Sequence, residues 1–358
     1  MSNAIVDTHA EAAQLELPPL LIRDPLAAFL DEHGLGGGGP IEAEPLGEGH
    51  SNVTYLIRRG KTELVLRRPP RPPLPPSAHD VLREAQLLQA VEPVAVRTPR
   101  VLATCADDSV IGAPFYVMEK VEGDVITTQV PPALDTPEQR ERIVEELIDA
   151  LVEVHAVDWR ACGLEGYGKP TGYLERQLRR FGGLWEHNKT REIATLDKVT
   201  AWLAAQRPES GPATIVHGDY RLGNTMFGVG GDGSARLVSI FDWELATIGD
   251  PLADVGYLAA TYAQADDPGG TIFSLGAVTT QPGFPSRAEL IARYEERSGR
   301  SMGDVAWYAT LALWKAAIFL EGSYKRLLAG TTDDPFFKLL DRGVPELAEH
   351  AWRVAHGE

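Results

Sequence analysis

Three side chains near the middle of the sequence have the types, order and spacing that phosphoryl transfer requires. Asp219 lies in the segment His-Gly-Asp-Tyr-Arg-Leu-Gly-Asn, Asn224 ends that segment, and Asp242 follows 18 residues later in Phe-Asp-Trp-Glu. Such a reaction needs a carboxylate that accepts the proton of the attacking hydroxyl, an amide that holds a metal ion, and a carboxylate that holds Mg²⁺ against the nucleotide phosphates. We therefore predict that Asp219 is the catalytic base and that Asn224 and Asp242 are magnesium ligands.

The elements that must position these residues are short strands. Thr214–Val216 and Leu237–Ile240 are β-rich runs, and each leads into one of the two aspartate segments. The alternative, in which one aspartate caps a turn and the other ends a strand, requires three residues and their flanking strands to coincide by chance.

The protein-kinase form of this set is an HRD loop that ends in Asn, followed by DFG. Here Gly218 replaces the Arg, and Phe-Asp-Trp-Glu replaces Asp-Phe-Gly. In this form the chain resembles the aminoglycoside phosphotransferase-like (choline kinase-type) family of small-molecule kinases. The resemblance implies an α+β, two-lobed protein-kinase-like fold with a small β-rich N-lobe and a large, mostly helical C-lobe.

A small polar turn, Leu46–Asn52, precedes the β-rich run Thr54–Ile57 and indicates a strand-turn-strand flap over phosphates. Glycines in hairpins supply positive φ more often than they contact ligands, so both interpretations stay open. The candidate nucleotide contacts in this flap are Gly47, Gly49, Ser51 and Asn52.

The next predicted strand, Thr62–Arg67, carries Val65 and Arg67 on one face, as the Ala and Lys of a VAIK motif would lie. We predict that Arg67 reaches the phosphates and pairs with Glu84, on a helix capped by Ser77. The alternative for Glu84 is a solvated helix position. Because a guanidinium is a planar fork and an ammonium is a point charge, Arg in place of Lys also motivates a pseudokinase that binds nucleotide without turnover.

Val-Leu-Arg followed by the proline-rich run Pro69–Pro76 also resembles the kinase-like domain associated with acyl-CoA dehydrogenases, over the chain from about Pro45. The turn-forming stretch Glu119–Gly123 is the predicted hinge, where backbone groups near Glu119 and Val121 would meet the base. Because a hinge reads the base through its main chain, ATP versus GTP stays open.

Three regions are expected: a flexible N-terminus over residues 1–22, a nucleotide-binding N-lobe over 23–121, and a catalytic and acceptor-binding C-lobe over 122–358. The run Gly228–Gly233 matches G-x-G-x-x-G, but strand-like sequence flanks it, so we predict a hairpin turn. Asp250, in Gly-Asp-Pro, is expected to brace the catalytic loop or to cap the following helix.

The amino-acid composition of the chain limits the kinds of partner that it can bind. A net charge of −17 over 358 residues argues against nucleic acid or an anionic membrane surface. Cys105 and Cys162 form no metal or disulfide pattern, and no apolar run of membrane-spanning length occurs, so we expect a cytoplasmic protein. The oligomeric state stays open.

The acceptor is expected to be a small molecule with a hydroxyl group. A basic cluster in this acidic chain suits an acceptor that carries phosphate or carboxylate, such as a hydroxyacyl thioester of coenzyme A. Surface pairing with acidic side chains is the alternative, and a cationic aminoglycoside would suit the net charge. A protein kinase is disfavoured because no Ala-Pro-Glu segment follows Asp242. We therefore expect a kinase that uses ATP and Mg²⁺. The basic cluster consists of Arg176, Arg179, Arg180, Lys189 and Arg191.

Overall fold

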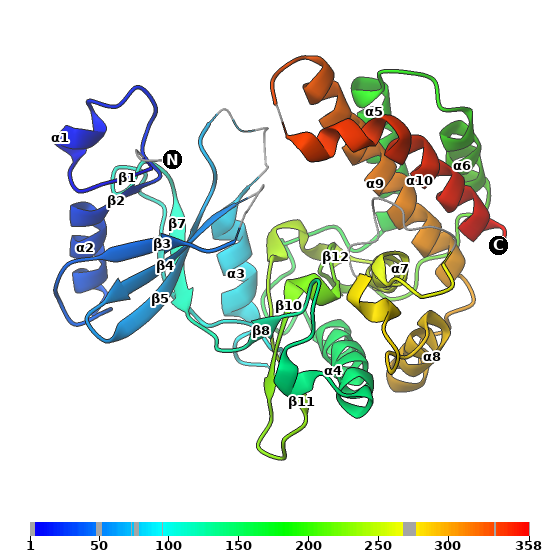
Figure 1. Ribbon diagram of the computed structural model, residues 1–358, viewed down its shortest axis with the longest axis horizontal. Coiled ribbons are helices and arrows are strands. Elements are labelled where there is room, and N and C mark those ends of the chain that lie inside the picture. The colour runs from blue at the N-terminus through cyan, green and yellow to red at the C-terminus, as the bar shows by residue number, and fades with distance from the viewer. Residues whose placement is uncertain are drawn as a thin grey trace. The chain divides into compact units, whose positions relative to one another are not determined.

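The computed structural model describes residues 4–47, 52–72, 74, 79–94, 96–267, 277–332 and 334–357. The chain divides into two compact units, Met1–Glu122 and Gly123–Glu358 (Figure 1). The first unit is built around a β-sheet and the second is mostly helical, which confirms the predicted fold class. The candidate residues Gly49 and Ser51, and the expected helix cap Ser77, lie outside the described residues.

The first unit contains a five-stranded antiparallel sheet in the order β3-β4-β5-β7-β6. Helix α2 (Arg23–Glu32) packs against one face of the sheet, because Leu26 shares a core with Leu64 and Leu66. Strand alternation turns Arg67 to the opposite face, toward α3 (Val81–Val91). The strands are β3 (Glu42–Pro45), β4 (Val53–Arg59), β5 (Thr62–Arg68), β6 (Val101–Cys105) and β7 (Phe115–Glu119).

The predicted flexible N-terminus, residues 1–22, contains regular secondary structure in its described part. Strand β1 (Ile5–Val6) pairs in parallel with β2 (Leu21–Ile22), and a short helix α1 (His9–Ala12) lies between them. Leu21 is fully buried, and the buried guanidinium of Arg68 donates to the Leu20 carbonyl. The buried run is too short to show a sequence period, so this order depends on contacts with distant residues.

The second unit has two small antiparallel sheets, β11-β10-β8 and β12-β9. Strands β10 and β11 form the predicted hairpin, in which Gly228 and Val229 still belong to β10 and the turn follows them. The strands are β8 (Asp124–Val125), β9 (Thr214–Val216), β10 (Thr225–Val229), β11 (Ala235–Ile240) and β12 (Thr247–Gly249).

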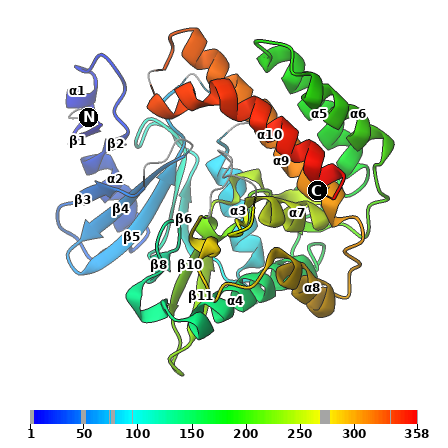
Figure 2. The ribbon, with the colours of Figure 1, turned by 45° about the vertical axis from the view of Figure 1, so that its right-hand side comes forward.

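Helices α5, α6, α9 and α10 of the second unit share one core (Figure 2). The central helix α9 buries nearly every side chain from Trp307 to Ile318, so a charged residue within that span lies among apolar neighbours. Among the described helices, none is long and apolar enough to cross a membrane. The α-helices are α4 (Pro137–Ala156), α5 (Tyr173–Asn188), α6 (Ala194–Ala205), α7 (Leu252–Thr261), α8 (Arg287–Ser298), α9 (Val305–Leu328) and α10 (Leu340–Ala355). Short 3₁₀ turns are η1 (Pro132–Leu134), η2 (Leu222–Asn224), η3 (Trp243–Leu245), η4 (Ala277–Thr280) and η5 (Pro335–Leu339).

Candidate active site

The loop that carries Asp219 leaves β9 beside η3. Gly218 has φ of 90°, and a Cβ there would lie 2.9 Å from the carbonyl oxygen of Leu245. Both the left-handed backbone and the close approach exclude larger residues at this position. The glycine that replaces the kinase arginine is therefore a requirement of this loop.

Asn224 is tied to Asp219 and to the second aspartate segment. Its Nδ2 donates to the Asp219 carboxylate oxygen Oδ2 at 2.7 Å and to the Asp219 carbonyl at 2.9 Å. The Phe241 amide donates to the Asn224 carbonyl at 3.0 Å, because Thr225 and Ile240 pair across the hairpin. The hairpin thus explains how residues 18 apart in sequence come together.

Asp242 adopts a left-handed backbone conformation, with φ of 65° and ψ of 54°, just before η3. A non-glycine residue in this region is strained by about 1–3 kcal/mol, and such residues concentrate at functional sites. The following Trp243 is buried, and its indole donates to the Ile240 carbonyl at 2.9 Å. The packed indole therefore helps to hold the strained turn.

Asp254, on α7, braces the catalytic loop. Its two oxygens accept from the amides of Gly218 and His217, each at 2.7 Å. The expectation that Asp250 braces the loop is wrong, since its oxygens accept from the Leu252 amide and the Tyr308 hydroxyl. Asp250 is closer to the other predicted role, a cap of the following helix, because it accepts from the amide of Leu252, the first residue of α7, although Pro251 occupies the N-cap position.

A buried histidine supports this brace. Nε2 of His155 lies 3.2 Å from Asp254 Oδ2, and its Nδ1 lies 2.7 Å from the Tyr294 hydroxyl. Burial lowers the pKa of His155, even though the Asp254 carboxylate acts in the opposite direction. Burial would raise the pKa of Asp254, but the hydrogen bond and charge of His155 outweigh it and hold that pKa below its usual value. The sequence indicates only a structural role for His155, without a partner.

His217 reaches the second aspartate segment from the first. Its Nε2 lies 2.9 Å from the Phe241 carbonyl, to which it must donate, and its Nδ1 accepts from the Asp219 amide at 3.2 Å. This pattern requires one proton on Nε2. The imidazole therefore connects the two loops through both of its nitrogens.

The Asp219 carboxylate keeps one oxygen without a hydrogen-bond donor. Oδ1 is buried and accepts no hydrogen bond from any described residue, although Arg221 Nε lies 3.5 Å away. Tyr257, half-buried on α7, lies close to Asp219, because burial, then the charge of Asp219 and a hydrogen bond to it, raise the pKa of Tyr257 well above the usual value. A buried acceptor without a donor is costly unless a ligand supplies one.

The candidate nucleotide residues of the first unit include the predicted ion pair. Arg67 Nε donates to Glu84 Oε2 at 2.9 Å, and both side chains are largely buried. The helix of Glu84 begins later than expected, because Asp80 caps it by accepting from the Arg83 amide. The pair joins the strand and the helix as the sequence predicts.

The remaining candidates of the first unit differ in how the structure uses them. Gly47 has φ of 76°, which a turn glycine explains without a ligand, and Asn52 is buried. The Glu119 amide donates to the Arg100 carbonyl at 2.9 Å, so this amide is engaged within the chain, while Val121 is half-buried.

Asn224 and Asp242 offer the types of oxygen that suit a magnesium ion with further ligands from phosphates. The Asn224 amide nitrogen is committed to Asp219, so the amide oxygen is turned away from that carboxylate. In the described part of the chain, no group of three or more His, Cys, Asp or Glu side chains could hold a metal by itself. An amide and a carboxylate supplemented by phosphate and water oxygens is a common Mg²⁺ environment.

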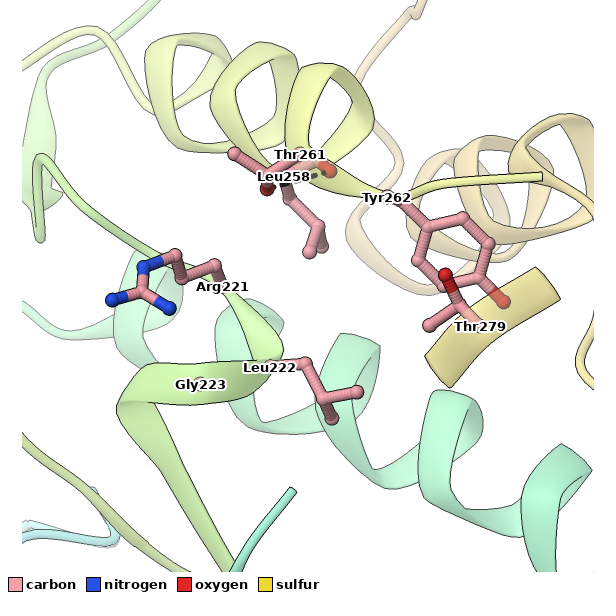
Figure 3. A pocket seen from close by; sticks show the side chains of 7 residues that line it. All are labelled: Arg221, Leu222, Gly223, Leu258, Thr261, Tyr262 and Thr279. Atoms are coloured by element: carbon pink, nitrogen blue, oxygen red, sulfur yellow. Dashed lines mark hydrogen bonds between the residues drawn. The ribbon is translucent and has the colours of Figure 1, made fainter. Parts of the chain in front are cut away.

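A small pocket of about 10 Å³ lies behind the catalytic loop (Figure 3). Leu222, Leu258 and Tyr262 contribute to its wall, while the Arg221 guanidinium points away from Thr279. This volume accommodates about one water molecule. It is too small for an acceptor substrate.

Most of the predicted basic cluster is engaged locally, which favours surface pairing over a shared anion site. Arg180 is the exception, because it makes no ion pair with a described residue and instead lies 5.8 Å from the Phe181 ring centroid. The engaged residues and their partners are Arg176 with the carbonyls of Lys169 and Thr171, Arg179 with Glu175, Lys189 with Glu186, and Arg191 with Glu321 and Asp341.

Comparison with known proteins gives a consistent family. The model of a family described as "Phosphotransferase enzyme family" matches residues 42–308. Acyl-CoA dehydrogenase family member 10 of Mus musculus is 32% identical over 99% of the chain, which spans 33% of that protein. Family member 11 of Homo sapiens is 31% identical over 90% of the chain, which spans 42% of that protein. The chain thus corresponds to less than half of these relatives.

The solved structures of similar fold are also described as phosphotransferases. A candidate aminoglycoside phosphotransferase from Ralstonia eutropha JMP134 is 31% identical with a TM-score of 0.78, and the match covers 93% of this chain and 98% of that one. A thermostable mutant of aminoglycoside phosphotransferase APH(4)-Ia, in ternary complex with AMP-PNP and hygromycin B, is 16% identical with a TM-score of 0.59, covering 94% and 100% of the two chains. The GDP complex of aminoglycoside 2'-phosphotransferase-IIIa is 18% identical with a TM-score of 0.57, covering 88% and 93%. The last two matches concern the fold alone.

Proposed function

The chain belongs to the phosphotransferase enzyme family, and from this premise we propose that it transfers the γ-phosphate of ATP to a hydroxyl group of a small molecule. The observation that carries this proposal is the Asp219 oxygen Oδ1, which lacks a donor among the described residues. A substrate hydroxyl would donate to this carboxylate and lose its proton to Asp219 as the hydroxyl oxygen bonds to the γ-phosphorus. The bond from that phosphorus to the bridging oxygen then breaks, and ADP leaves.

Asn224 and Asp242 would supply the amide and carboxylate oxygens of a magnesium site. When bound, Mg²⁺ would neutralise charge on the nucleotide phosphates. Asn224 also orients Asp219, because the same amide group donates to the carboxylate at 2.7 Å. Positioning and charge neutralisation, rather than covalent chemistry by the protein, would lower the barrier.

The first unit would contribute nucleotide contacts. Arg67, held by Glu84 at 2.9 Å, would bring a positive charge to the α and β phosphates. The flap residues and the main chain near Val121 would complete the nucleotide contacts. A neighbour of the same fold is described as a GDP complex and another as binding AMP-PNP, so competition between ATP and GTP belongs in the test.

The acceptor we favour is an anionic hydroxyacyl compound, because Arg180 of the basic cluster makes no ion pair with a described residue. A pseudokinase is the main alternative, because Arg67 replaces the usual lysine. An aminoglycoside kinase is the other, because a neighbour of the same fold is described in complex with hygromycin B.

A phosphorylation screen tests these alternatives. Native protein and Asp219→Asn are incubated with γ-labelled ATP or GTP, Mg²⁺ and a panel of hydroxy acids, sugars and aminoglycosides. We expect label transfer to a hydroxy acid by the native protein, and a loss of about 10²–10⁴ in rate in the variant. Nucleotide binding without transfer to any acceptor would support the pseudokinase instead.

A further inference from the structure

Two cationic side chains from different helices of the second unit share one aromatic ring. The Lys315 ammonium, on α9, lies 4.9 Å from the centroid of Phe181, and the Arg180 guanidinium, on α5, lies 5.8 Å from the same centroid. Neither cation forms an ion pair with any carboxylate among the described residues, unlike the neighbouring Arg179 and Arg191. Two like charges therefore converge where no described carboxylate forms an ion pair with either of them.

An exposed aromatic side chain lies beside these cations. Phe319 follows Lys315 by one helical turn, and 48% of its surface is exposed. Its ring packs edge-on against Phe181, with 5.2 Å between the centroids. The combination of two cations and an exposed ring suits a ligand that has both an anionic group and a carbon skeleton.

The environment of Lys315 makes an isolated ammonium unfavourable. Burial, and then the charge of Arg180, lower the pKa of Lys315 to about 8. Asp254 and Asp219 act in the opposite direction, so Lys315 is within electrostatic range of the candidate base. A partly desolvated cation beside another cation gains most from an anion that joins both.

We propose that Lys315 and Arg180 bind the anionic group of the acceptor, a carboxylate or a phosphate, while Phe319 contacts its carbon skeleton. This inference rests on the proposed function, because it assigns the charge of the acceptor and the residues that select it. It also predicts that polycationic acceptors bind poorly, since both side chains would repel them. The surface next to Arg180 is open, because a Cβ added at Gly183, one turn further along α5, would meet no atom within 4 Å.

Equilibrium binding measured by calorimetry tests the assignment without any need for turnover. The carboxylate arm compares 3-hydroxybutyrate with its methyl ester, and the phosphate arm compares glycerol 3-phosphate with glycerol. The proteins are the native chain, Lys315→Met, Lys315→Arg and the control Lys198→Met, which removes the same charge from an exposed position on α6. Thermal melting establishes that each variant is folded.

We expect the native protein to bind at least one anion about tenfold or more tightly than its neutral counterpart. Lys315→Met should lose that preference, whereas Lys315→Arg and Lys198→Met should keep it. Equal binding of anion and neutral compound, persistence of the preference in folded Lys315→Met, or no binding of any probe would overturn the assignment. Preserved anion preference together with failure to phosphorylate any acceptor would instead count against the proposed function alone.

Discussion

Replacing Asp254 by asparagine should loosen the catalytic loop without touching the reacting atoms. The carboxylate accepts from His217 and Gly218 at 2.7 Å each, and it lies 3.2 Å from His155. An asparagine offers one acceptor oxygen where the carboxylate offers two. At least one buried amide of the loop is then left without its acceptor.

The expected cost follows from these contacts. A buried donor that loses its acceptor costs about 1–3 kcal/mol, and more when the acceptor is charged. Breaking a fully buried charged network costs about 3–5 kcal/mol. We therefore expect Asp254→Asn to lower the free energy of unfolding by about 3 kcal/mol, and a loop displaced by about 1 Å to lower kcat about 100-fold.

The measurements are urea denaturation, amide hydrogen exchange and turnover, with Asp250→Asn as the matched control. Asp250 is equally buried, but it accepts from Leu252 and Tyr308 and not from the loop. Exchange at the His217 and Gly218 amides should accelerate about 100-fold in Asp254→Asn and little in the control. Unchanged exchange at these amides, or an equal loss of turnover in folded Asp250→Asn, would refute the bracing role.

The pH dependence gives a second check of the same group. The pKa of Asp254 is lower in the folded state than the ordinary aspartate value of 3.8. The ionised carboxylate therefore stabilises the fold fully above pH 3.8, and this stabilisation is lost as the pH falls below 3.8 toward the folded-state pKa. The difference in stability between native protein and Asp254→Asn should therefore be constant at neutral pH and shrink below about pH 4.

Three further outcomes are expected. Asp219→Asn should keep nucleotide affinity within a few-fold in a titration while turnover falls, and near-normal turnover would remove it as the base. Asp242→Ala should abolish the Mg²⁺ dependence of nucleotide binding; an unchanged dependence would leave this residue with only a turn to form. Because burial lowers the pKa of His155, the unfolded chain takes up its proton first, and stability should fall as the pH drops below 6.5. In denaturation curves, His155→Gln should reduce the dependence of stability on pH between about pH 7 and 5. The remaining dependence is due to His350, whose pKa burial also lowers. An unaltered pH dependence would contradict this account.

The parts of the site that the sequence predicts are those fixed by local pattern. Asn224 and Asp242 flank a hairpin whose strands and turn are readable from residue type, and Arg67 and Glu84 occupy a strand and a helix with clear periods. Each of these contacts follows once the adjoining elements are correctly identified. The ion pair was predictable although 17 residues separate its members.

The parts that could not be predicted depend on how helices dock. Asp250 and Asp254 lie one helical turn apart, and no local signal decides which of them points at the loop. His155 meets Asp254 across 99 residues, through a contact between separate elements. In the sequence, Lys315 only interrupts an apolar helix. The structure is needed to show that Lys315 and Arg180 lie at the same Phe181 ring.

Asp219, in the catalytic loop, and Asp254, which braces that loop, carry the same chemical group. They differ in burial and in the hydrogen-bond donors that surround them. Asp254 is fully buried, and both of its oxygens accept hydrogen bonds from the loop. Asp219 has a side chain that is 21% exposed, and its Oδ1 accepts none from the described residues. A brace works when both carboxylate oxygens accept from the protein, whereas a general base needs a lone pair that no protein donor occupies. The number of donors around each carboxylate, in addition to its place in a motif, is therefore why we propose Asp219 as the base and Asp254 as its support.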